Sequence, residues 1–279
     1  MDVPAGIQGD GASNEVPVPS EDLAEMSFLE HLEELRWAIL KGLGALLLIT
    51  IAASFFSKWI IDVLLLGPAK ADFFMYKFFG IEAENLYLQN RTITGQFFAH
   101  IGTVVAVGLV IGSPAVVYFF WKFIEPGLYA REKKGMRFAA VFATFFFMLG
   151  ILFGYLIITP LALQFFANYQ ISSQIVNEFD ITKYFSMVTF WAFGVGVLFE
   201  LPVVVYFLAK VGLVTGKMLR GFRRYAVILV LVLGAIFTPP DPISQTLVAI
   251  PLYILYELSI QIASYVERKE QAALEAALK

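Results

Sequence analysis

A single carboxylate stands inside a long apolar stretch of the chain. Glu200 lies in the apolar run 184–209, within the motif Phe-Glu-Leu-Pro at 199–202. A run of this length is typical of a membrane-spanning helix, because about 20 apolar residues cross a hydrocarbon core roughly 30 Å thick. Glu200 precedes Lys210 by ten residues, so at about 1.5 Å per residue the carboxylate is about 15 Å deep.

A carboxylate at that depth costs several kcal/mol unless it is protonated, paired or in contact with water. Two interpretations stay open: a neutral acid bonded to a neighbouring helix, or a carboxyl that faces an aqueous groove entered by a partner. Pro202 follows and removes a backbone hydrogen bond, so we expect a kink beside Glu200.

The composition indicates a polytopic membrane protein. Of 279 residues, 59% are hydrophobic and 15% are charged, with a mean hydropathy of +0.74, whereas soluble domains carry about 25% charged residues. The sequence has no cysteine and two histidines, His31 and His100, so we expect no disulfide, thiolate site, metal centre or cofactor. No basic tract outside the membrane flanks indicates nucleic-acid binding.

The apolar runs predict an all-α fold of six transmembrane helices. Loops of mixed composition join the first five predicted spans, and the fifth and sixth spans form a hairpin. The fifth has 13 residues, about 20 Å of helix, so we expect the last two helices to be short and the membrane to be thinned there. The predicted spans are 37–56, 97–121, 138–158, 184–209, 225–237 and 243–260.

Positive charge predicts the orientation of these spans. With the N-terminus inside, fifteen Lys and Arg residues fall on the cytoplasmic side and five on the other. This bias predicts that both termini are cytoplasmic.

The sequence predicts three parts of the chain: a leader, a transmembrane domain and a tail. Residues 1–25 are polar, acidic and rich in Gly and Pro, which predicts a disordered cytoplasmic leader. Residues 26–262 form the six-helix domain, and 263–279 form a cytoplasmic tail. Ser27 and Glu30 have the spacing of a capping box, so we expect an amphipathic helix on the membrane surface before the first span.

Two further segments lie on the outer side. The loop 57–96 carries five aromatic residues between 73 and 79, which predicts packing over the outer helix ends. The last two spans are joined by Thr238, Pro239, Pro240, Asp241 and Pro242, a rigid turn that cannot continue a helix. We expect this turn to be recessed below the outer membrane surface.

Four motifs in this order give the chain a family resemblance. They are HLEELR at 31–36, FIEPGLYARE at 123–132, FELP at 199–202 and TPPDPISQ at 238–245. On a six-span frame, the segment from about 26 to 260 resembles TatC, the polytopic subunit of the twin-arginine protein translocase. The resemblance implies a glove-shaped helical receptor in the cytoplasmic (inner) membrane that binds signal peptides with consecutive arginines.

The same resemblance implies roles for individual residues. Glu34 and Glu132 would contact the signal arginines, with Arg36 beside them and Phe123 and Leu128 shaping the site. Carboxylates accept the bidentate hydrogen bonds that a guanidinium donates, which agrees with this assignment. From the residues alone, Glu132 could equally belong to a mixed-charge loop, and Glu34 could lie on the polar face of a surface helix.

The resemblance also implies partners. Glu200 would be the buried acid of the concave face, and Thr238 and Gln245 would be polar contacts for the single-span proteins TatA and TatB. The expected function is export of folded cargo, driven by the proton-motive force, in a complex of several copies. The acidic leader is a departure from the family pattern.

Three other functions are alternatives to this one. A proton-coupled transporter of small solutes could use Glu200, although no second mid-membrane charge offers a relay. An intramembrane protease needs a Ser–His or paired-Asp arrangement within the spans, which His100 and Glu200 do not supply. A purely structural assembly protein would bind partner helices without binding signal peptides. We expect no enzymatic activity.

Overall fold

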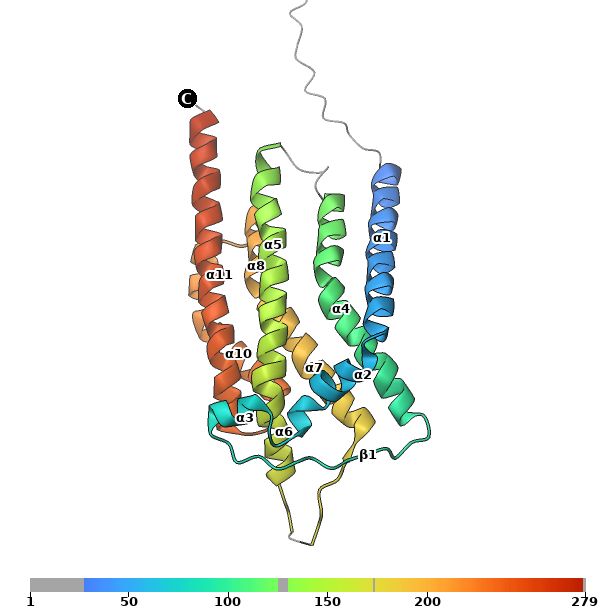
Figure 1. The fold of residues 1–279 in the computed structure, drawn as a ribbon. Coiled ribbons are helices and arrows are strands. Elements are labelled where there is room, and N and C mark those ends of the chain that lie inside the picture. The colour runs from blue at the N-terminus through green and yellow to red at the C-terminus, as the bar shows by residue number, and fades with distance from the viewer. Residues whose placement is uncertain (1–27, 125–129, 173, 278–279) are drawn as a thin grey trace, which may run out of the picture.

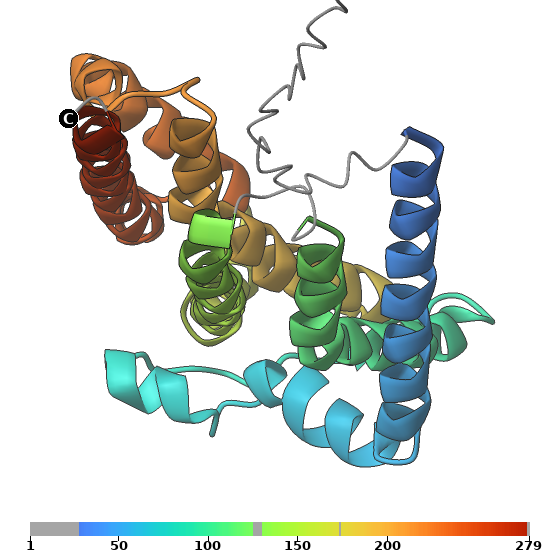
Figure 2. The same ribbon diagram turned by 90° about the horizontal axis from the view of Figure 1, so that it is seen from above.

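The residues that the structure describes form mainly helices, with one very short pair of strands. The computed structural model describes residues 28–124, 130–172 and 174–277. Its long helices stand side by side, with the start of α1, the end of α4, the start of α5 and the end of α11 at the upper end in Figure 1. Seen from above, the helices follow an open arc from α1 to α11 (Figure 2). The predicted leader, residues 1–25, lies outside the described residues.

Helix α1 (Phe28–Ser54) packs against α4 (Gly95–Ile124) at one end of the arc. Two glycines of α4 allow this contact, since a Cβ on Gly108 would lie 2.9 Å from the Cα of Thr50 and a Cβ on Gly112 would lie 2.5 Å from Leu46. The prediction of a separate surface helix was wrong: α1 runs without a break into the first span. No glycine or proline stands between 28 and 41, so nothing interrupts the backbone hydrogen bonds.

The segment after α1 covers the lower end of the bundle. It contains four short helices and the strand β1 (Leu88–Gln89), which pairs in parallel with β2 (Phe179–Asp180). Tyr76 is buried and Phe73 packs edge-on to Tyr155, as the prediction of aromatic packing required. The short helices are α2 (Ser57–Trp59), η1 (Ile60–Leu65), η2 (Gly67–Ala69) and α3 (Phe74–Phe79).

The third span is longer than its apolar run predicted. Helix α5 (Ala130–Phe153) continues through a wider turn, η4 (Gly154–Ile158), into α6 (Thr159–Asn168). The predicted end at 158 was therefore too early. Pro160 stands in the first turn of α6, where its missing N–H needs no helical partner. The Thr159 hydroxyl donates to the Gly154 carbonyl at 2.9 Å and helps to carry the chain through this junction.

The fourth span is two helices joined at Glu200. Helix α7 (Ile181–Phe199) ends there and α8 (Leu201–Lys210) begins. Pro202 is the second residue of α8, so the predicted kink takes the form of an interruption rather than a bend within one helix. A glycine lets η4 approach α7 closely. A Cβ on Gly154 of η4 would lie 2.4 Å from the carbonyl oxygen of Trp191 in α7.

The C-terminal hairpin contains one short helix and one long one. Helix α9 (Gly216–Gly221) leads into α10 (Arg223–Phe237), and α11 (Pro242–Ala277) returns to the upper end. The 15 residues of α10 confirm the predicted short fifth helix. The prediction of a short last helix was wrong, because α11 has 36 residues and includes most of the predicted tail. The residues after 263 are rich in Ala, Glu, Lys and Arg, which favour helix in water.

The main apolar core lies where α7 meets the segment after α1 (residues 57–89), η4–α6 and the C-terminal hairpin. Its buried members include Tyr184, Trp191, Val195 and Val248. Two smaller cores hold the edges, one between α8 and α11 and one between α1, η1 and α4. Helix α7 packs against α4, α5, α10 and α11, and Glu200 follows its last residue.

Candidate functional site

Glu34 lies in the second turn of α1 at the upper end of the bundle. Its side chain is half-buried, and its Oε2 atom is buried without a hydrogen-bond donor in the described part of the chain. A buried carboxylate oxygen without a donor is costly, because its hydration is lost and nothing replaces it. The neighbouring Glu33 is exposed. Glu34 therefore offers an acceptor that a cationic ligand could satisfy.

The other predicted members of this site lie on the adjacent helix ends. Arg36 is exposed on α1, and Phe123 is half-buried in the last turn of α4, with its ring 6.4 Å from that of Phe120. Glu132 lies in the first turn of α5. Leu128 is outside the described residues. The structure thus brings the helices that carry Glu34, Phe123 and Glu132 to the same end of the bundle (Figure 1).

Glu200 occupies the junction between α7 and α8. Its backbone N–H donates to the Val197 carbonyl at 3.1 Å, and its own carbonyl accepts from Val203 and Val204. The side chain is half-buried and interacts with the backbone of Phe147 in α5. A helix interruption leaves backbone groups that a polar side chain and water can satisfy. Glu200 is therefore both a carboxyl inside the helical array and a residue at a break in the backbone.

The turn between α10 and α11 is held by its own polar groups. Asp241 caps α11, since its Oδ2 accepts from the Ser244 N–H at 2.8 Å, and Pro242 begins the helix. Thr238 is buried and donates from its hydroxyl to the Gly234 carbonyl at 2.9 Å. Gln245 donates from Nε2 to the Leu231 carbonyl at 3.0 Å.

The two prolines complete this turn, with Pro239 buried and Pro240 exposed. The predicted polar contacts Thr238 and Gln245 therefore already have partners inside the hairpin.

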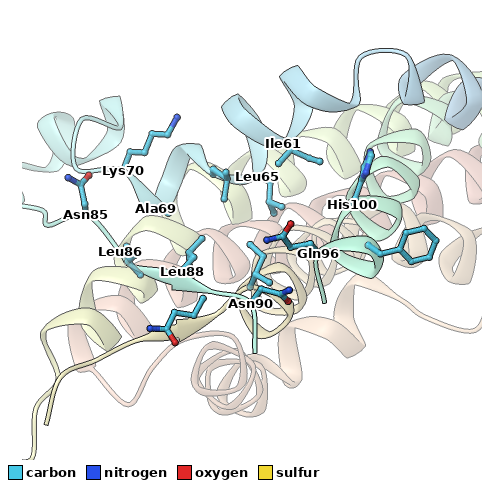
Figure 3. A pocket seen from close by; sticks show the side chains of 15 residues that line it. Ile61, Leu65, Ala69, Lys70, Asn85, Leu86, Leu88, Asn90, Gln96 and His100 are labelled. Carbon is cyan, nitrogen blue, oxygen red and sulfur yellow. The ribbon is translucent and has the colours of Figure 1, made fainter. Parts of the chain in front are cut away.

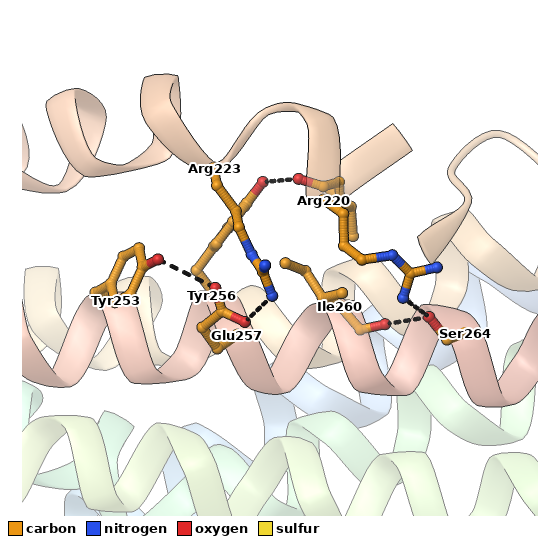
Figure 4. A network of polar contacts seen from close by, with 8 residues as sticks. Arg220, Arg223, Tyr253, Tyr256, Glu257, Ile260 and Ser264 are labelled. Carbon is orange, nitrogen blue, oxygen red and sulfur yellow. Dashed lines mark hydrogen bonds and ion pairs between the residues drawn. The ribbon is translucent and has the colours of Figure 1, made fainter. Parts of the chain in front are cut away.

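A polar network that the sequence did not predict joins α9, α10 and α11 (Figure 4). Arg223 forms an ion pair with Glu257 at 2.7 Å, and the Tyr253 hydroxyl donates to the same carboxylate at 3.1 Å. The Tyr256 hydroxyl donates to the Leu219 carbonyl at 2.6 Å. The spacing of Tyr253, Tyr256 and Glu257 on one helical face was a usable signal. The partners of Tyr256 and Glu257, however, lie more than 30 residues away in the chain.

These features define a class of protein. In the part of the chain that the structure describes, five helices are long and apolar enough to cross a membrane. The helical fold carries a half-buried carboxylate at its upper end, and another lies at a break within a span. Among the described residues, no cluster of three or more His, Asp or Glu side chains could hold a metal ion. The chain is therefore a polytopic helical membrane protein.

Comparison with known proteins identifies the family. The family model of the Sec-independent protein translocase protein (TatC) matches residues 30–251. The chain is 37% identical over 260 residues to the TatC of Blattabacterium, covering 88% of this chain and 98% of that protein. It is 34% identical over 247 residues to the TatC of Aquifex aeolicus, with 88% and 98% covered.

The solved structures agree. A crystal structure of the twin-arginine translocase receptor TatC superposes with a TM-score of 0.65 at 34% identity, covering 85% of this chain and all of that one. The same receptor in DDM gives a TM-score of 0.67. The chain belongs to the TatC family, which confirms the expected family and fold class. The comparisons give no support to a small-solute transporter.

Proposed function

We propose that this protein is the signal-peptide receptor of a twin-arginine translocase. It would bind the twin-arginine signal peptides of folded cargo proteins at the upper end and take part in export driven by the proton-motive force. Family membership supports this proposal, and so does the description of the similar crystal structures as a translocase receptor. The observation that carries it is the buried Oε2 of Glu34, which has no hydrogen-bond donor among the described residues.

We infer an inner-membrane location with six spans, α10 being the shortest, and both termini in the cytoplasm. Five apolar helices and the intervening α10 support this count. The start of α1 and the end of α11 lie at the same end of the bundle (Figure 1). Fifteen of the twenty Lys and Arg residues fall on the side assigned to the cytoplasm. The upper end is then the face that a signal peptide reaches.

In this proposal two carboxylates receive the arginine pair. Glu34 and Glu132 would each accept a bidentate pair of hydrogen bonds from one guanidinium. Arg36 would offset part of the negative charge of the two carboxylates, and Phe123 and Leu128 would form the apolar wall of the site. A guanidinium at Glu34 would supply the donor that Oε2 lacks, which makes the site selective for a ligand with several N–H groups in one plane.

We propose that TatA- and TatB-type single-span proteins bind beside the C-terminal hairpin in a complex of several copies. The outward face of α10 is apolar and exposed, including Ile228, Leu229 and Val232. Thr238 and Gln245 would act there through the hairpin, since their side chains hold Gly234 and Leu231 of α10. A partner helix would then meet a face of fixed shape.

Glu200 would serve as a polar contact within the concave face. Because glutamine keeps the shape and hydrogen bonding of a neutral carboxyl, Glu200→Gln should keep both fold and transport. Glu200→Ala should lose transport. Export of a reporter cargo from cells measures this, and normal export by Glu200→Ala would remove the residue from the proposal.

Binding of two signal peptides tests the receptor site directly. One peptide carries the arginine pair and the other has both arginines replaced by lysine, which keeps the charge but not the planar donors. Loss of one charge-assisted bidentate contact should cost roughly 1.5–3 kcal/mol, or about 10- to 150-fold in affinity. Wild type, Glu34→Ala and Glu132→Ala are compared in detergent, and each variant should show most of that loss.

Glu33→Ala is the matched control, because it removes the same charge from the adjacent, exposed position. It should bind the arginine peptide nearly as well as wild type. If the arginine and lysine peptides bind equally to every protein, or if Glu33→Ala and Glu34→Ala weaken binding equally, the receptor site is wrongly assigned.

A further inference from the structure

A pocket at the lower end of the bundle is separate from every residue of the proposed receptor site. Its volume is about 730 Å³, within the range of pockets that hold small molecules. Its walls come from η1 and η2, from the extended chain around β1 and from the first turns of α4 and α7 (Figure 3). Three of these segments lie within residues 61–100, and the fourth is the start of α7.

The lining of this pocket is divided between apolar and polar groups. Nine of its fifteen residues are apolar, among them Ile61, Leu65 and Leu88 in the middle of the view in Figure 3. The other six are one lysine, one histidine and four side-chain amides, and none of the fifteen is Asp or Glu. Such a lining matches a ligand with an apolar part and a negatively charged polar part.

The apolar side of the pocket is continuous with the membrane-facing surface of α4. Phe97 lines the pocket and is itself 61% exposed, and the adjacent Phe98 is 62% exposed, with its ring 5.6 Å from that of Phe97. Ile101, one turn further along, is exposed as well. Because α4 is a membrane-spanning candidate, a hydrocarbon chain could pass from the bilayer into the pocket without crossing water.

The polar side of the pocket offers donors for an anion. The Lys70 ammonium donates to the backbone carbonyl of Asp62 at 3.0 Å, which uses one of its three N–H groups. Asn85 is fixed beside it, since its Oδ1 accepts from the Ala71 N–H at 2.9 Å and its amide N–H groups are left to donate. At the other end of the pocket, His100 and Gln96 add polar groups (Figure 3).

We propose that this pocket binds one anionic phospholipid from the adjacent leaflet. The phosphate would be held at the Lys70 end by the ammonium and the neighbouring amides, and an acyl chain would lie along the apolar wall towards Phe97. A free phosphate shares the headgroup chemistry but leaves the apolar wall unused. The lipid satisfies both parts of the lining and would fix the outer segment against the start of α4.

Lipid binding by the purified full-length chain tests this inference. Phosphatidylglycerol and phosphatidylcholine with identical acyl chains are titrated in a mild detergent, and retained lipid is counted by native mass spectrometry. Wild type should retain one phosphatidylglycerol. Lys70→Gln should weaken its binding by about 10-fold or more, as expected for loss of a charge-assisted contact. Lys70→Arg should retain it, because the charge is kept.

Matched controls separate the pocket from general attraction to the surface. Lys77→Gln removes a lysine of the same segment that does not line the pocket, and it should bind like wild type. Gln96→Trp fills the pocket from an exposed position and should prevent binding, whereas Phe98→Trp on the same turn should not. This second pair tests the site even if Lys70→Gln alters the loop.

Three results would overturn the inference. Equal retention of phosphatidylglycerol by wild type, Lys70→Gln and Gln96→Trp would remove the pocket as its site. Equal binding of phosphatidylcholine and phosphatidylglycerol would remove the charge selectivity. Displacement of the lipid by millimolar inorganic phosphate would show an anion site that makes no use of the acyl chain.

Discussion

The two ends of the arc are held in place by different means. In the most apolar stretch of α1 only 11% of the residues are buried, whereas in the most apolar stretch of α11 44% are buried. Helix α1 relies on close backbone contact with α4 at Gly108 and Gly112. Helix α11 is tied by side chains to α8, α9 and α10, including the Lys210–Glu270 pair at 3.3 Å.

This difference assigns different tasks to the two ends. Helix α1 is mostly exposed, so it presents a large surface to lipid or partners. Its position depends on its line of contact with α4. A helix held by several independent contacts tolerates the loss of any one of them. The variants below test whether stability follows this contrast.

The largest effect is expected at the contact between α1 and α4. A Cβ on Gly108 would meet the Cα of Thr50 at 2.9 Å, so Gly108→Ala must push the helices apart, at a cost of about 1–3 kcal/mol. Gly44→Ala on α1 is the control, because nothing lies within 4 Å of its added Cβ. Thermal unfolding in detergent should show a clear fall in Tm for Gly108→Ala alone. Equal Tm values would mean that the contact is not limiting.

The next effect is expected between the two ends, where the segment after α1 is bonded to α7. The buried Tyr184 hydroxyl donates to the Leu65 carbonyl at 2.6 Å. Tyr184→Phe removes this hydrogen bond, which should destabilise the fold by about 0.5–1.5 kcal/mol, less than the clash at Gly108. Tyr169→Phe removes a hydroxyl from an exposed ring and should be neutral. The comparison fails if both variants unfold at the same temperature as wild type.

A smaller effect is expected in the C-terminal network. Glu257→Gln removes the ion pair with Arg223, but Arg223 is solvent-exposed and other contacts hold the same helices. Exposed ion pairs contribute little and are screened by salt. We expect a smaller fall in Tm than for Tyr184→Phe, and it should shrink further in high salt. Glu267→Gln, on the same helix, is the control. A loss as large as that of Gly108→Ala would contradict the idea of redundant contacts.

The smallest effect is expected at Asp180, which caps α7. Its pKa is lowered, first by the hydrogen bond from the Thr182 hydroxyl and then by backbone N–H groups that include Lys183. A carboxyl with a lowered folded-state pKa contributes stability above its ordinary value, here 3.8, and loses it as the pH falls through the folded-state value. Asp180→Ala should therefore lower the Tm slightly at pH 7.

The same variant should match wild type once the pH is well below 3.8. Unfolding curves at several pH values measure this difference. A constant difference across the whole range would show that Asp180 acts through packing rather than through its charge.

Much of the fold was predictable because the apolar runs are long. Hydropathy located every long helix and the short α10, since a membrane span needs a continuous apolar stretch. The helix ends were less predictable, because they depend on local backbone bonding rather than on hydropathy. Residues 263–277 continue α11 in spite of their polarity, and α6 continues past the predicted end of its span.

The candidate site was predictable only in part, for a similar reason. The motif at 31–36 indicated Glu34, but the buried Oε2 depends on neighbours that packing brings together. The Arg223–Glu257 pair joins residues 34 apart in sequence, and no local pattern indicates which acid meets which base. The positions of Leu128 and of the Glu132 side chain lie outside what the structure describes.

The small sheet at the lower end has a consequence for the order of folding. Leu88 pairs with Phe179, and the chain between them contains α4 and the whole of α5–α6. The pair cannot form until both of these segments have been inserted, because its second strand emerges only after them. Closure of such a large loop is costly in entropy and therefore comes late. The lower end of the bundle is thus completed after the helices that it covers, and a pulse-labelled chain should acquire protease resistance there last.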